Sequence, residues 1–125
     1  MADSPHFHYL QTEWPEVYIA AAKAEALLHA DSRTSCFYAR RALELAVNWL
    51  YQHDQSLTAP YRDDLSAFIY NDQFRTLAGQ TLLAKIKIIK DLGNAAVHSP
   101  KPIPKTEALT AVRELFHFTY WFART

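Results

Sequence analysis

Glycine is nearly absent from this chain, and its scarcity limits what the chain can fold into. Only two glycines, Gly79 and Gly93, occur in 125 residues, and runs that alternate β-branched with polar residues are few. Tight hairpin turns depend on glycine and strands are enriched in β-branched residues, so little of the sequence suits a sheet. Apolar residues recur instead at helical spacing. We therefore predict an all-α fold, a compact bundle of about five to six helices.

The helices are expected to form one domain. A chain of 125 residues buries roughly two thirds of its unfolded surface, which is enough for one core. We predict a flexible N-terminal segment over residues 1–14 and a single helical domain over residues 15–125.

Start and stop signals place the individual helices. Proline suits the first helical position, so Pro15 begins the first helix, and Asp31 or Ser32 caps the second. Gly79 ends a short helix, and Thr106 is expected to cap the last one. The predicted helices span residues 15–28, 33–53, part of 61–71, 72–78, 81–92 and the stretch after Thr106.

Composition narrows the classes of function. Thirteen basic and thirteen acidic residues give a net charge of zero, whereas dedicated nucleic-acid-binding domains usually carry a positive excess. The single cysteine, Cys36, allows no internal disulfide and is predicted to be a buried structural thiol. Because no apolar run has membrane-spanning length and no secretory signal is visible, we expect a cytoplasmic protein without a membrane partner.

The last predicted helix is apolar around most of its circumference. An isolated domain would leave part of it, including its aromatic rings, exposed. Either an oligomer such as a homodimer covers this surface, or the chain is the front part of a longer protein; the second interpretation is favoured. The expected core face comprises Leu109, Val112, Leu115, Phe116, Thr119 and Phe122, with Phe118, Tyr120 and Trp121 elsewhere.

The most informative motif is Gly93-Asn94-Ala95-Ala96-Val97-His98. Glycine inside a helix costs about 1 kcal/mol relative to alanine, so Gly93 requires close packing or a bend. Asn94 and His98 are four residues apart and share a helix face. One interpretation is a polar site pressed against a neighbouring helix. The other is a helix end, where Asn94 and His98 satisfy free backbone carbonyls.

A second pair with four-residue spacing, Arg40 and Glu44, lies in the predicted helix over 33–53. It is either an exposed ion pair worth a few tenths of a kcal/mol or part of a buried contact. In the second case Glu44 turns inward and meets Asn94 or His98, which would fix the tautomer of the imidazole.

Other catalytic and ligand-binding patterns are missing from the sequence. The six histidines show no metal-ligand spacing, neither glycine belongs to a phosphate-binding loop, and no nucleophile is paired with a base. We predict no catalytic residue, no metal ligand and no cofactor in this domain. A modest basic surface, either a solvated face or a nucleic-acid contact, is formed by Lys85, Lys87, Lys90, Lys101, Lys105 and Arg113.

Three segments together resemble a known family. They are Ala39-Arg40-Arg41-Ala42-Leu43-Glu44, the Gly93–His98 motif, and Leu115-Phe116-His117-Phe118-Thr119-Tyr120-Trp121-Phe122. Over residues 15–125 the combination resembles the HEPN-like helical domain at the N-terminus of type I restriction endonuclease R subunits. The resemblance implies an accessory or docking domain without chemistry of its own. Its structural motif would comprise Arg40, Glu44, Gly93, Asn94 and His98.

The resemblance also implies a parent protein with its own cofactors and partners. In that family the domain precedes a nuclease domain and a superfamily 2 helicase-type DNA translocase. The complete subunit cleaves DNA with ATP and magnesium, together with methyltransferase and specificity subunits. We therefore expect ATP and magnesium for the parent chain only. The implied partners are the downstream domains, the other two subunits, and DNA through the complex.

The same domain is similar to the HEPN superfamily, whose catalytic members are ribonucleases with an Arg-Asn-x-x-x-His motif. Asn94 and His98 match that motif, but Gly93 stands at the arginine position. Phosphodiester cleavage needs a cation near the developing charge and a proton-transfer group. We therefore expect no ribonuclease activity. The alternatives to a docking domain remain a HEPN-type ribonuclease or toxin and a freestanding helical binding partner.

Overall fold

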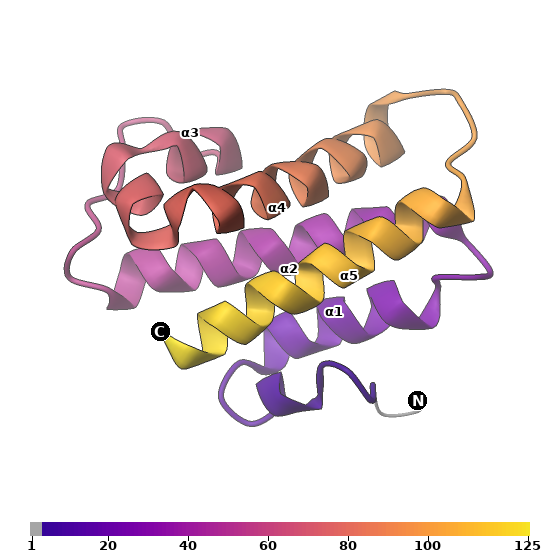
Figure 1. Cartoon of the computed structure of the whole chain (residues 1–125), viewed down its shortest axis with the longest axis horizontal. Coiled ribbons are helices and arrows are strands. Elements are labelled where there is room, and N and C mark those ends of the chain that lie inside the picture. Colours follow the sequence, from indigo (N-terminus) through magenta and orange to yellow (C-terminus); the bar gives the residue numbers. More distant parts are fainter. Residues whose placement is uncertain (1–3) are drawn as a thin grey trace.

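A computed structural model describes residues 4–125, and every regular element in that range is helical. This confirms the predicted all-α bundle. None of the described helices is both long and apolar enough to cross a membrane. A short 3-10 helix, η1 (His8–Leu10), precedes the α-helices (Figure 1), which are α1 (Pro15–Ala26), α2 (Ser32–His53), α3 (Leu65–Tyr70), α4 (Asp72–His98) and α5 (Lys105–Arg124).

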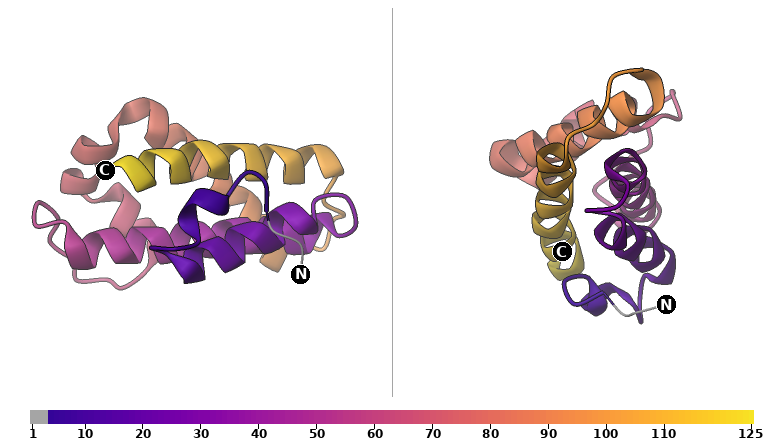
Figure 2. Two further views of the ribbon diagram at one scale, coloured as in Figure 1. Left: turned by 90° about the horizontal axis from the view of Figure 1, so that it is seen from below. Right: turned by 90° about the vertical axis from the view of Figure 1, so that its right-hand side faces the viewer.

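The central helix of the bundle is α2, which packs against α1, α4 and α5. The last two helices also pack against each other, and the short α3 lies against the beginning of α4. At the bottom of the end-on view, the N-terminal segment spans the space between α1 and α5 (Figure 2, right).

Several helix boundaries follow from local signals. Pro15 occupies the first turn of α1, and the Asp31 side chain accepts a hydrogen bond from the Thr34 backbone N–H at 3.1 Å, as expected of a cap. Hydrogen bonds from the Thr34 hydroxyl and N–H lower the pKa of Asp31. The predicted Thr106 cap is wrong. Helix α5 already begins at Lys105 because Pro104 sets the chain direction immediately before it, and no side chain caps this end.

Gly79 interrupts α4. Its φ of 82° and ψ of 164° are non-helical, a conformation that glycine adopts without steric cost. The predicted boundary between residues 72–78 and 81–92 therefore coincides with a real break. After it the helix continues to His98, so the glycine motif lies inside the final turns of α4 and not beyond them.

Residues 4–14 pack against the bundle. Residues 4–14 belong to the segment predicted to be flexible, yet Phe7 and Leu10 are fully buried. The Tyr9 hydroxyl lies 2.6 Å from the hydroxyl of Thr119 on α5. Residue 15 is therefore not the edge of the packed domain, because apolar side chains before it complete the core. Residues 1–3 of the predicted segment lie outside the described residues.

The N-terminal segment also affects which side chains of α5 are buried. Phe118 is fully buried and Leu109 is half-exposed, so the predicted assignment of these two residues was wrong. The buried face of α5 differs from the predicted face because η1 packs against a further side of the helix. On that side the ring centroids of Phe7 and Phe116 lie 6.2 Å apart. Apart from the exposed His117 and Tyr120, the rings of α5 are buried or half-buried within the chain.

Cys36 lies in the core with no exposed surface. Burial, and secondarily the negative charge of Glu107, raise the pKa of its thiol to about 11. The predicted structural thiol is confirmed.

A thiol with this pKa is almost entirely protonated at neutral pH, and only the thiolate reacts with alkylating reagents. We expect iodoacetamide to leave Cys36 unmodified in the folded protein at pH 7.5 and to modify it fully in denaturant, as measured by mass spectrometry. Rapid alkylation under native conditions would contradict the buried placement.

Candidate functional site

Gly93 lies where α4 packs tightly against Arg40 of α2. A Cβ atom added to Gly93 would lie 2.3 Å from Cβ and 2.6 Å from Cδ of Arg40. Real Cβ atoms do not approach other atoms so closely, so the two backbones can reach this spacing only with glycine at this position. Close packing thus accounts for a glycine inside the helix.

Of the two interpretations of Glu44, the ion pair with Arg40 is confirmed and the contact with Asn94 or His98 is wrong. The Glu44 carboxylate accepts hydrogen bonds from Arg40 Nη1 at 3.3 Å and from Arg41 Nη1 at 3.2 Å. Two arginines within one turn of the same helix supply its positive partners, so Glu44 needs none from α4. The side chains of Asn94 and His98 make no hydrogen bond within residues 4–125, and His98 is exposed.

The residue that satisfies the last carbonyls of α4 is Arg33, which the sequence analysis missed. Its guanidinium donates to the carbonyl oxygens of Ala96 at 2.6 Å, Ser99 at 2.9 Å and Lys101 at 2.6 Å. The final carbonyls of a helix have no partner within the helix, and a planar fork of donors suits them. Arg33 therefore fixes both the end of α4 and the start of the proline-containing connection to α5.

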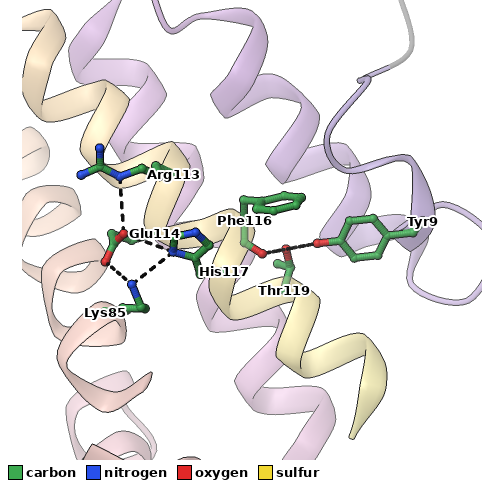
Figure 3. Close-up of polar contacts among 7 residues, drawn as sticks. All are labelled: Tyr9, Lys85, Arg113, Glu114, Phe116, His117 and Thr119. Carbon is green, nitrogen blue, oxygen red and sulfur yellow. Dashed lines mark hydrogen bonds and ion pairs between the residues drawn. The ribbon is translucent and has the colours of Figure 1, made fainter. Parts of the chain in front are cut away.

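A second polar cluster joins α4 to α5 (Figure 3). The Glu114 side chain is only 9% exposed and accepts a hydrogen bond from Lys85 Nζ at 3.2 Å. Its carboxylate also lies 3.6 Å from Arg113 Nε and 3.4 Å from His117 Nδ1. A largely buried carboxylate is thus surrounded by basic side chains, an arrangement that offsets the cost of removing its charge from water.

We expect Glu114→Gln to lower the free energy of unfolding by about 1–3 kcal/mol, because the amide keeps the shape but leaves Lys85 without an anion. Urea denaturation measures the change. The control is Glu107→Gln, the same substitution at an exposed residue of α5, expected to change stability by less than about 0.5 kcal/mol. Equal effects of both substitutions would show that the cluster does not stabilise the fold.

The predicted basic surface divides into groups. Lys85 and Arg113 converge on Glu114, whereas Lys87 and Lys90 lie over the Tyr70 ring, with their Nζ atoms 5.1 and 5.6 Å from its centroid. The remaining members, Lys101 and Lys105, are exposed at the connection before α5 and at its first residue.

The Gly93 motif shows no catalytic constellation within the described residues. His98 has no hydrogen-bond partner there, and the nearest upstream cation, Lys90, is paired with Asp91 at 3.3 Å. Within residues 4–125, no group of three histidine, cysteine, aspartate or glutamate side chains is arranged to hold a metal ion. The motif instead sets the spacing between α2 and α4.

The fold and these contacts define a small helical-bundle domain in which Gly93 allows α2 and α4 to pack closely. The chain belongs to the DUF4145 family, a domain of unknown function, whose family model matches residues 22–120. The matched range includes α2 and α4 with the Arg33, Arg40 and Gly93 contacts. No curated protein and no solved structure matches the chain significantly.

Proposed function

We propose that this domain is a non-catalytic docking module at the N-terminus of a restriction-type protein, like the helical domain of type I endonuclease R subunits. The observation that carries the proposal is the use of the motif in packing. Gly93 meets the Arg40 side chain, and Arg40 in turn pairs with Glu44 at 3.3 Å. A motif engaged in helix contacts is suited to holding a rigid shape that other proteins bind.

In this proposal the chemistry belongs to the parent chain, an ATP-dependent DNA translocase and endonuclease that requires ATP and magnesium and works in the cytoplasm. The domain contacts the downstream domains of its own subunit and the methyltransferase and specificity subunits. It reaches DNA only through that complex, which agrees with its net charge of zero.

The proposal is tested by the molecular mass of the native protein and by the proteins that bind to it. Immunoblotting of source-cell lysate with an antibody to this domain should detect a band many times larger than 14.4 kDa. The same antibody should co-precipitate a DNA methyltransferase subunit, identified by mass spectrometry. A band at 14.4 kDa without such a subunit would reject the restriction-subunit proposal.

The ribonuclease alternative makes a different prediction, namely that the chain cleaves RNA and that cleavage requires His98. Because His98 is exposed and has no hydrogen-bond partner within the described residues, we expect His98→Ala to change stability by less than about 0.5 kcal/mol. We also expect the unsubstituted chain to leave labelled single-stranded and structured RNAs intact. RNA cleavage that disappears in His98→Ala would replace the docking proposal with a HEPN-type ribonuclease.

A further inference from the structure

A hollow of about 220 Å³ lies where the start of α1 meets the middle of α2. Two tryptophans, Trp14 and Trp49, and two glutamates, Glu13 and Glu16, contribute to its lining, and Leu45 forms part of its apolar surface. None of these residues belongs to the motifs described above. The hollow thus combines aromatic rings with carboxylates.

The aromatic part of this hollow is held rigidly. The rings of Trp14 and Trp49 are nearly perpendicular, with an interplanar angle of 85° and centroids 5.6 Å apart. The Trp49 ring also stacks on His53 at a centroid distance of 4.0 Å, and Trp14 packs against Phe122 at 4.7 Å. Rigid tryptophan rings attract cations through their quadrupole without losing conformational freedom on binding.

The charge of the lining favours the same kind of ligand. Glu13 and Glu16 are exposed, and neither forms an ion pair with any residue in the range 4–125. No lysine or arginine lines the hollow. The nearby Arg41 belongs to the lining of an adjoining hollow and is paired with Glu44 at 3.2 Å. The hollow therefore carries two uncompensated carboxylates, which attract a cation and repel phosphate or nucleic acid.

Trp14, which lines the hollow, also carries a hydrogen-bond donor that is unpaired within residues 4–125. Its indole Nε1–H is buried and has no hydrogen-bond acceptor in the part of the chain that the structure describes. Buried indole donors usually find a partner, since leaving one unpaired costs free energy. A peptide carries both groups that this lining lacks, a backbone carbonyl as acceptor and a basic side chain as cation.

The surface next to this hollow has room for more of a peptide. A second hollow, of about 270 Å³, shares Glu16 and Leu45 with the first and is also lined by Ile19 and Tyr38. Ile19 is 48% exposed, so apolar surface continues along the α1–α2 face. A segment with one basic residue followed by apolar residues matches both hollows.

We propose that the hollow formed by Glu13, Trp14, Glu16 and Trp49 binds an arginine or lysine side chain of a partner protein's peptide segment. The guanidinium or ammonium group lies against the tryptophan rings and pairs with the carboxylates. The inference rests on the proposed docking function, because it names the chemistry by which one surface of the module recognises a partner.

The test uses the full 125-residue chain and the probe N-acetyl-arginine methylamide, with the citrulline analogue as a neutral control of the same shape. Nitrogen-15 NMR follows the indole N–H signals at constant ionic strength. We expect saturable shifts of the Trp14 and Trp49 signals with the arginine compound. The paired change Glu13→Gln and Glu16→Gln should weaken binding at least about fivefold, whereas Glu107→Gln, which changes an exposed glutamate elsewhere, should not.

Equal responses to the arginine and citrulline compounds, or no shift of either indole signal, would overturn the inference. The same holds if the paired glutamine variant keeps full affinity while its spectrum remains that of a folded protein. Failure of the docking function looks different. Arginine then still binds the isolated chain, but the native protein has its own small size and co-precipitates no methyltransferase subunit.

Discussion

Replacing Gly93 with alanine is expected to lower the free energy of unfolding by about 1–3 kcal/mol, although alanine is the better helix former. The added methyl group would lie 2.3 Å from Cβ of Arg40, an atom next to the backbone that no rotamer change moves away. The two helices must therefore separate, which disturbs the core around α2. Thermal unfolding followed by circular dichroism should show a fall of several degrees in Tm.

Two comparisons separate this clash from other effects. Ala84→Leu enlarges an exposed residue of the same helix and is expected to change stability by less than about 0.5 kcal/mol. Adding Arg40→Ala to Gly93→Ala should not restore stability, because alanine keeps the Cβ atom that clashes. A Gly93→Ala variant as stable as the unsubstituted chain would show that α2 and α4 do not approach this closely.

The Phe7→Ala substitution is expected to have the largest effect, a loss of about 3–5 kcal/mol, because it empties a fully buried site. The ring contacts Phe116 edge-on at a centroid distance of 6.2 Å, and the same segment reaches α5 again through Tyr9 and Thr119. Without the Phe7 ring, the contact between the N-terminal segment and α5 is weakened. Urea denaturation of the purified variant measures the loss.

His8→Ala serves as the control, because His8 is an exposed member of the same short helix, and we expect it to be nearly neutral. A chain that begins at Pro15 provides a second measurement. It should expose the aromatic side of α5 and bind the dye ANS, which reports accessible apolar surface. If Phe7→Ala were no more destabilising than His8→Ala, the N-terminal segment would not be part of the core.

Features set by neighbours in sequence were predictable. Pro15, Asp31 and Gly79 act through their own backbone or the next turn, and the structure places a helix start, a cap and a break at these residues. Gly93 was predicted to mark close packing or a bend, since a glycine inside a helix is costly wherever it occurs, and the structure shows close packing.

Features that depend on distant residues were missed. Tyr9 meets Thr119 across 110 positions, and Arg33 reaches the carbonyl of Lys101 across 68. Nothing near Arg33 in sequence marks its target, because backbone carbonyls look alike in every sequence. The partner of Glu44 was left open for a related reason: four-residue spacing shows that Arg40 and Glu44 share a face, but not whether Glu44 pairs with Arg40, as it does here, or turns toward another helix.

The break at Gly79 has a mechanical consequence for α4. A continuous helix transmits a push or a twist along its hydrogen-bond ladder, whereas a residue at φ 82° interrupts that ladder. The turns beside α3 and the turns that carry Gly93 and His98 are therefore two helical segments joined at Gly79. A displacement of α3 can reach the later turns of α4 through packed side chains, including those of α2, which contacts both α3 and α4.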